Sequence, residues 1–226
     1  MGNINQRTTS LKVKGVADIV FCFDCTGSMR PIIDGVKENV KNLVEGFKTA
    51  DIEALDWRAR VMGYRDFEVD DEYLINDRPF VSTEEELKNQ IDGLEALKDS
   101  GGDDPESTLD AIWYAAKKSD WRSKCHKIVV LFTDDAPKPV NEKTLEEIEG
   151  ADGDIELLSQ ELNVQHVKLF LWGKTDPAYD ALKKIPRADI VQLDNPEEDF
   201  KSLDFGNLMN TIGKTISELV TSGVTE

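Results

Sequence analysis

The chain has 226 residues, of which 39% are hydrophobic, and a formal net charge of −18 at pH 7. This length suffices to bury the core of one large domain, and the acidic balance argues against nucleic acid or an anionic membrane as a partner. Three cysteines that cannot all pair, no charged leader before an apolar run, and no apolar stretch of the roughly 18 residues that a membrane helix needs predict a soluble, cytoplasmic protein.

A polar arm, residues 1–14, is expected to precede a single domain over residues 15–222. Residues 17–24 are almost continuously apolar, which is typical of a central parallel strand covered on both faces. A helix is expected next, because Pro31 suits a first helical turn and apolar residues then recur every three or four positions. The predicted buried face of this helix consists of Ile32, Ile33, Val36, Val40, Leu43, Val44 and Phe47.

Residues 58–64 predict a second strand, and residues 73–81 predict a short third strand at the edge of the sheet. Ser82 or Thr83 then caps a helix that opens with three glutamates, which suit the positive end of the helix dipole. Pro105 fits the start of the following helix. The predicted apolar stripes are Leu87, Ile91, Leu94 and Leu97 in the first of these helices, and Leu109, Ile112, Trp113 and Ala116 in the second.

The second half of the chain continues the alternation of strand and helix. Strands are predicted at residues 126–133, 164–172 and 190–193, and helices near residues 141–163, 178–184 and 198–220. Because every strong strand is followed by a helix, the sequence predicts an α/β fold. The expected form is a doubly wound, mostly parallel six-stranded sheet, with helices on both faces and one short antiparallel edge strand.

Three acidic loops are expected at one edge of this sheet, because ligands of doubly wound folds bind outside the carboxyl ends of the strands. The first loop contains Asp24, Thr26 and Ser28, the second spans residues 101–106, and the third is the pair at 134–135. Carboxylate and hydroxyl oxygens with water suit Mg²⁺, with Mn²⁺ or Ca²⁺ as alternatives. Such residues are also ordinary turn and cap residues, so only the convergence of three loops favours a metal site over a structural role.

At these positions the chain resembles the von Willebrand factor type A domain family, whose members carry a metal-ion-dependent adhesion site. The resemblance extends from about Gly15 to Val220. The first family motif, Asp-x-Ser/Thr-x-Ser, matches Asp24, Thr26 and Ser28, and the last matches Asp134 in Phe-Thr-Asp-Asp. The resemblance implies the Rossmann-like fold of the family and these four residues as metal ligands.

The middle ligand departs from the common family pattern. Most members have a Thr after a Gly-rich turn, whereas here Gly-Gly is followed by Asp103, with Asp104 as the competing register. Gly-Gly-Asp-x-Pro-Glu, together with Tyr-Arg-Asp ending in Asp66, resembles the intracellular subgroup of the family. A third carboxylate would neutralise more of the cation's charge, and the hypothesis is tighter metal binding with less need of an acidic group from a partner.

The resemblance implies a metal-dependent protein-binding module rather than an enzyme. A protein partner is expected to complete the coordination of the metal, and the rim of the contact is expected to consist of Met29, Asp66, Asp104 and Asp135. The partner, the process and the oligomeric state are left open by the sequence. Two alternatives are a metal-assisted phosphoester hydrolase, with Asp135 or Glu106 as the acid, and an assembly subunit in which the metal is only structural.

Other chemistries find less support in the sequence. Cys22 and Cys25 have the spacing of a redox pair, but they lie at a strand end rather than at the start of a helix, so Cys22 is predicted to be a small core residue. No base adjoins an activated nucleophile, which favours the binding module over the hydrolase.

Overall fold

The computed structural model describes residues 15–38, 56–68, 70, 74–75, 78–97, 105–140, 154–204 and, between 207 and 215, all but two positions. The predicted polar arm, the second half of the first predicted helix and the start of the predicted helix at 141–163 lie outside these residues. Two of the predicted site residues, Asp103 and Asp104, also lie outside them.

The centre of the fold is a six-stranded sheet with the order β3-β2-β1-β4-β5-β6. All neighbouring strands pair in parallel except β3, which pairs antiparallel with β2. This arrangement confirms the predicted fold class, including the short antiparallel edge strand. The strands are β1 Val16–Asp24, β2 Asp56–Tyr64, β3 Leu74–Ile75, β4 His126–Phe132, β5 Val167–Lys174 and β6 Ala188–Leu193.

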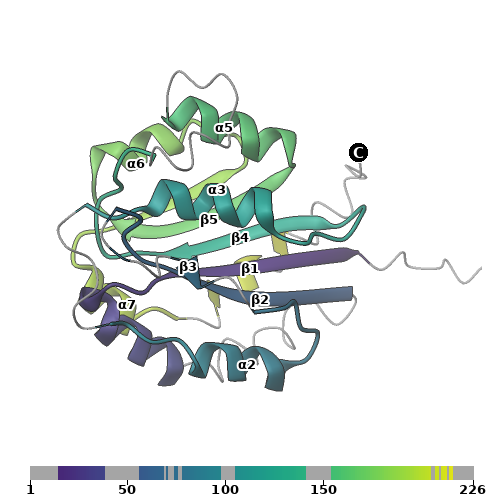
Figure 1. The fold of residues 1–226 in the computed structure, drawn as a ribbon, viewed down its shortest axis with the longest axis horizontal. Helices are drawn as coiled ribbons and strands as arrows, with labels where there is room; N and C mark the ends of the chain where they lie inside the picture. Colours follow the sequence, from purple (N-terminus) through teal and green to yellow (C-terminus); the bar gives the residue numbers. More distant parts are fainter. Residues whose placement is uncertain are drawn as a thin grey trace, which may run out of the picture.

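Helices cover both faces of the sheet (Figure 1). One face carries α3 Thr108–Lys118, α5 Asp154–Val164 and α6 Pro177–Leu182, and the other carries a helix at residues 30–38, α2 Glu84–Asp92 and α7 Pro196–Lys201. Since the central strands are parallel, β1, β2, β4, β5 and β6 all end at the same edge, named here the carboxyl edge, and begin at the opposite amino edge.

The central strand β1 is buried on both faces, as its uninterrupted apolar sequence predicts. Phe21 and Phe23 pack into the core cluster that contains Leu87 of α2, whereas Val20 and Cys22 pack into the cluster that contains Trp113 of α3. Cys25 belongs to the first cluster and Cys22 to the second, and neither forms a disulfide. The two cysteines therefore lie on opposite sides of the sheet and form no redox pair.

Local capping explains where α2 begins and ends. Thr83 is the N-cap and accepts a hydrogen bond from the Glu86 backbone N–H, as predicted. The helix ends at Asp92, so the predicted stripe is only partly buried: Leu87, Ile91 and Leu94 are in the core, but Leu97 is 41% exposed.

Two helix boundaries differ from the prediction. Helix α3 begins at Thr108, three residues after Pro105, because Glu106 instead forms a parallel bridge with Pro137. The last predicted helix, 198–220, is interrupted: α7 ends at Lys201 and residues 202–204 are not helical. Neither the late start of α3 nor the interruption after α7 could be predicted from the periodicity of apolar residues.

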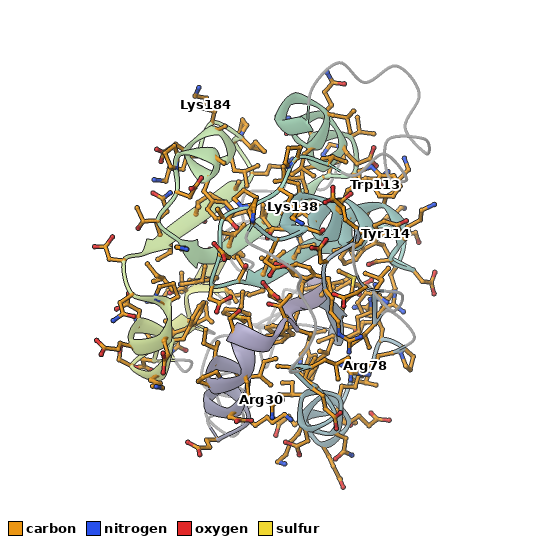
Figure 2. The ribbon with its side chains drawn as sticks, turned by 60° about the vertical axis from the view of Figure 1, so that its left-hand side comes forward. Arg30, Arg78, Trp113, Tyr114, Lys138 and Lys184 are labelled. Carbon is orange, nitrogen blue, oxygen red and sulfur yellow. The ribbon has the colours of Figure 1, made fainter. Side chains whose placement is uncertain are left out.

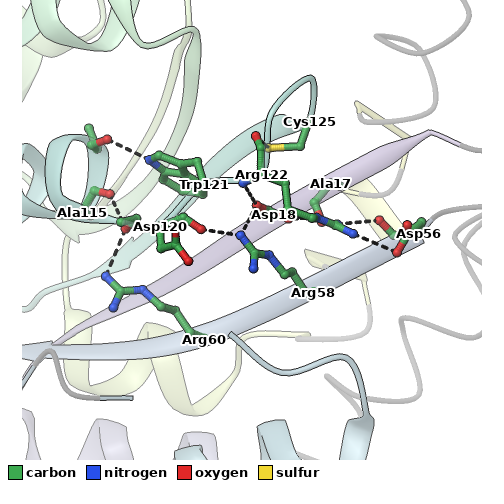
Figure 3. Close-up of polar contacts among 12 residues, drawn as sticks. Ala17, Asp18, Asp56, Arg58, Arg60, Ala115, Asp120, Trp121, Arg122 and Cys125 are labelled. Carbon is green, nitrogen blue, oxygen red and sulfur yellow. Dashed lines mark hydrogen bonds and ion pairs between the residues drawn. The ribbon is translucent and has the colours of Figure 1, made fainter. Parts of the chain in front are cut away.

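A polar network closes the amino edge of the sheet (Figure 3). Asp18 of β1 is fully buried and accepts hydrogen bonds from Arg58 Nη2 at 2.9 Å and from Arg122 N and Nε, each at 2.7 Å. Arg122 also donates to Asp56 Oδ1 and to two backbone carbonyls. Burial opposes ionisation, but the bonds from Arg58 and Arg122 outweigh it and lower the pKa of Asp18. This carboxylate is therefore compensated within the chain.

Candidate metal centre at the carboxyl edge

Asp24 is the last residue of β1 and the centre of the polar cluster at the carboxyl edge. Its side chain is fully buried. Oδ1 accepts hydrogen bonds from the Thr26 backbone N–H at 2.9 Å and from Thr26 Oγ1 at 2.7 Å, and Oδ2 accepts one from Thr133 Oγ1 at 2.9 Å. Thr133 directly follows β4, so the two central strands jointly fix the orientation of the Asp24 carboxylate.

The loop after Asp24 turns the two hydroxyl-bearing residues toward the same edge. Thr26 is the N-cap of a 3-10 turn, Gly27–Met29, and its carbonyl accepts a hydrogen bond from the Met29 N–H. Thr26 Oγ1 lies 3.4 Å from Ser28 Oγ, which in turn donates to Asp134 Oδ1 at 3.2 Å. The chain thus brings together the four predicted ligands that lie within the described residues: Asp24, Thr26, Ser28 and Asp134.

The electrostatics of Asp24 differ from those of an ordinary surface carboxylate. Burial and, second, the negative charge of Asp134 raise its pKa to about 7, although hydrogen bonds from Thr26 and Thr133 oppose the rise. No Lys or Arg side chain among the described residues forms an ion pair with Asp24. A cation at this position would supply the missing opposite charge.

Met29, Asp66 and Asp135 were predicted to form the rim, but the structure places them differently. Met29 is the last residue of the 3-10 turn and its side chain is fully buried in the core, so it does not reach the rim. Asp66 is also fully buried and pairs with Lys138 Nζ at 2.7 Å. Asp135 is 8% exposed and pairs with Lys174 Nζ at 3.0 Å. Figure 2, in which the carboxyl edge is turned toward the viewer, shows Lys138 near the centre of this edge.

A chain of buried hydroxyl groups, from two tyrosines and a threonine, lies next to the site. Tyr64, which pairs in register with Asp24, has its hydroxyl 2.9 Å from Thr108 Oγ1. Tyr179 OH donates to the Asp135 carbonyl at 2.8 Å and lies 3.4 Å from Thr108 Oγ1. No motif in the sequence predicts this chain of hydroxyls. The only available signal was the tyrosine that ends β2, directly before the predicted Arg-Asp motif.

A close backbone approach fixes the first loop against β2. The Cys25 N–H donates to the Tyr64 carbonyl at 2.7 Å, and a Cβ at Gly63 would lie 2.8 Å from Cys25 Sγ. Only glycine leaves room for this thiol. The strand β2 therefore determines the position of the loop that carries Thr26 and Ser28.

The donor set is suited to a hard cation that uses hydroxyls and water as well as carboxylates. Among the described residues, no three His, Cys, Asp or Glu side chains gather closely enough to hold a metal by themselves. The described donors are two carboxylates and two hydroxyls, and the second loop, with Asp103 and Asp104, falls outside the described residues. The fold and the residues at the carboxyl edge define the class of protein. It is a doubly wound α/β domain that presents oxygen donors at the carboxyl ends of its central strands.

The family follows from a comparison with known sequences. The family model described as the von Willebrand factor type A domain matches residues 18–212. The chain therefore belongs to the von Willebrand factor type A domain family. Comparison with curated proteins gives no significant match.

Solved structures with the same fold come from diverse proteins. Proximal thread matrix protein 1 from the mussel byssus aligns with a TM-score of 0.59 and 18% identity over 90% of this chain and 46% of that chain. The pilus adhesin SpaC from Lactobacillus rhamnosus GG aligns with a TM-score of 0.56 and 15% identity over 91% of this chain and 31% of that chain. The present chain thus spans less than half of either protein.

A third structure is comparable in length to the present chain. An aerotolerance-related membrane protein from Bacteroides fragilis NCTC 9343 aligns with a TM-score of 0.51 and 12% identity over 91% of this chain and 99% of that chain. At these identities the likeness concerns the fold alone. Within the described residues of the present chain, no helix is long and apolar enough to cross a membrane.

Proposed function

We propose that this domain is a protein-binding module whose carboxyl edge holds a Mg²⁺ ion of the type found in metal-ion-dependent adhesion sites. Asp24, Thr26, Ser28 and Asp134 would hold the ion, with Asp103 or Asp104 from the second loop. The observation that carries the proposal is the arrangement around Asp24: a fully buried carboxylate, linked through hydroxyls to Asp134 and raised in pKa to about 7.

The chemistry of these donors fits Mg²⁺. The ion accepts carboxylate and hydroxyl oxygens and retains several waters, so it needs few direct protein ligands. The Asp24 carboxylate is already oriented by three hydrogen bonds, which reduces the cost of ordering the site when the ion binds. Mn²⁺ or Ca²⁺ would meet the same oxygen donors at longer distances.

Protein binding is the role supported by family membership, since type A domains commonly bind proteins. Two of the structural neighbours are a thread matrix protein of the mussel byssus and a pilus adhesin. For the present chain we infer a protein partner that contacts the metal edge, in the cytoplasm as the composition suggests.

Metal binding is tested first, by titrating Mg²⁺ into the wild type and Asp24→Asn in a calorimeter. The matched control is Asp194→Asn, which removes an exposed carboxylate at the end of β6 that accepts a bond from Thr175. The wild type and the control should bind Mg²⁺, and Asp24→Asn should not. A wild type that does not bind Mg²⁺ contradicts the metal site.

Partner binding is tested second, by affinity purification from the native cell in Mg²⁺ and in EDTA, repeated with Asp24→Asn. Proteins retained only by the wild type in Mg²⁺ support the proposal. If the variant loses the metal but retains the same proteins, the metal is structural and binding occurs elsewhere on the domain.

A further inference from the structure

Glu106 is an acidic residue that the backbone fixes beside the proposed metal site. Its N–H donates to the Ala136 carbonyl at 2.8 Å, and its own carbonyl accepts from the Lys138 N–H at 2.6 Å and the Thr108 N–H at 2.8 Å. It also forms a parallel bridge with Pro137. These bonds join the segment before α3 to the segment that follows Asp134, so Glu106 is held at the carboxyl edge by both.

The side chain of Glu106 is buried, and one of its carboxyl oxygens is unbonded among the described residues. The residue is 4% exposed, and within the described part of the chain its Oε2 has no hydrogen-bond partner. A buried carboxyl oxygen left unbonded is costly, so native proteins keep one where another group completes it. Burial, followed by the negative charges of Asp24, Asp66, Asp135 and Asp134, raises the pKa of Glu106 to about 9. The backbone bonds to Ala136 and Lys138 place Glu106 beside the segment that contains Asp134 and Asp135.

The two lysines of the cluster are engaged with other acids. Lys138 contacts Asp66 at 2.7 Å and Glu68 at 3.4 Å, and Lys174 contacts Asp135 at 3.0 Å. The cation that would balance Glu106 must then come from outside the described chain. Mg²⁺ retains much of its hydration shell, so water bound to the cation can connect it to Glu106.

We propose that the Glu106 carboxylate accepts hydrogen bonds from water bound to the Mg²⁺. Its negative charge would then replace the negative charge that a carboxylate of the partner would otherwise supply near the ion. The proposal rests on the metal site proposed above. Mg²⁺ retains much of its hydration shell, and acceptors that orient bound water contribute strongly to metal affinity.

The charge balance in the metal-bound state then indicates which partner the edge can accept. A bound Mg²⁺ lowers the pKa values of the neighbouring carboxyl groups and favours their ionised forms. Asp24, Glu106, Asp134 and Asp135 would then provide four negative charges, against one ammonium from Lys174 and one divalent cation. The remaining charge is negative even with the metal bound, so a further carboxylate is repelled. The structure thus favours a basic segment of a protein as the partner, rather than an acidic one.

The role of Glu106 is tested by Mg²⁺ calorimetry on the wild type, Glu106→Gln and Glu68→Gln. Glu68 is the matched control, because it is an exposed acid on the neighbouring loop that contacts Lys138. Glu106→Gln should weaken Mg²⁺ binding about 10- to 100-fold, and Glu68→Gln should change it less than about twofold. Urea unfolding of each variant in EDTA verifies that all three fold.

The outcomes separate the two proposals. A wild type that does not bind Mg²⁺ overturns the metal site, and with it the role of Glu106. Equal affinities for the wild type and Glu106→Gln, with binding lost in Asp24→Asn, overturn the role of Glu106 alone.

The class of partner is tested with fluorescent random peptide pools, one enriched in Lys and Arg and the other in Asp and Glu, in Mg²⁺. The wild type should bind the basic pool with higher affinity than the acidic pool. Glu106→Gln should bind the acidic pool more strongly than the wild type does, so the difference between its two affinities should be smaller. Preference of the wild type for the acidic pool, or for neither, contradicts a basic partner.

Discussion

Asp24→Asn should stabilise the metal-free protein, because the wild-type carboxylate is buried without a cation. Burial, with the charge of Asp134, raises the pKa of Asp24 from 3.8 to about 7. A difference of this size corresponds to about 4 kcal/mol, since each tenfold change in an equilibrium constant is about 1.4 kcal/mol. A raised pKa favours the folded state below pH 3.8, and this contribution is lost as the pH rises through about 7.

The asparagine variant retains the shape of the side chain at a small cost. Its oxygen can accept both bonds from Thr26, while the Thr133 hydroxyl must turn from donor to acceptor, at about 1 kcal/mol. In EDTA the two proteins should be of similar stability at pH 4. At pH 8 the variant should be more stable by about 3 kcal/mol, or roughly 1 M in the urea midpoint.

Urea unfolding followed by circular dichroism, in EDTA at pH 4 and pH 8, measures this difference. Asp18→Asn is the control, since Asp18 is equally buried on the same strand but bonded to Arg58 and Arg122, so its replacement should destabilise at pH 8. The reasoning is refuted if Asp24→Asn is less stable than the wild type at pH 8 in EDTA, or if the difference does not change with pH.

Three further variants test the support of the site by urea unfolding. Lys138→Met should lower the free energy of unfolding by about 3–5 kcal/mol, because it leaves buried Asp66 without its cation. The double variant Lys138→Met/Asp66→Asn should recover most of this loss, and a double variant as unstable as Lys138→Met would contradict the pairing. Gly63→Ala should cost about 1–3 kcal/mol through the clash with Cys25 Sγ, and adding Cys25→Ala should relieve it if that contact is the cause. Thr108→Val should lower the free energy of unfolding by about 1–3 kcal/mol, because it removes the partner of the buried Tyr64 hydroxyl; an unchanged urea midpoint would show that this hydroxyl finds another partner.

The fold could be predicted from the sequence because its central strands are unusually apolar. Residues 17–24 and 126–133 have no polar face, which indicates parallel strands covered on both sides, and these became the adjacent strands β1 and β4. The boundaries of helices were less predictable. The start of α3 depends on the bridge between Glu106 and Pro137, which are distant in sequence and leave no periodic signal.

The candidate site was predictable to the extent that strand ends are predictable. Asp24 and Asp134 follow the two most apolar strands, so their proximity could be inferred from topology. What could not be inferred was burial. Met29 and Asp66 look like exposed loop residues in the sequence, but a 3-10 turn directs the first into the core and Lys138 holds the second in a buried ion pair.

The two buried aspartates of β1 provide the most direct argument for a ligand at the carboxyl edge. Asp18 and Asp24 are both fully buried near opposite ends of one strand. Arginine side chains lower the pKa of Asp18, whereas burial and a second acid raise that of Asp24. The chain can evidently compensate a buried carboxylate with its own cations, and at the amino edge it does so. Among the described residues, the hydrogen-bond donors to the Asp24 carboxylate are two hydroxyls and a backbone N–H, and none is a cation. The carboxyl edge is therefore where an external cation gains most.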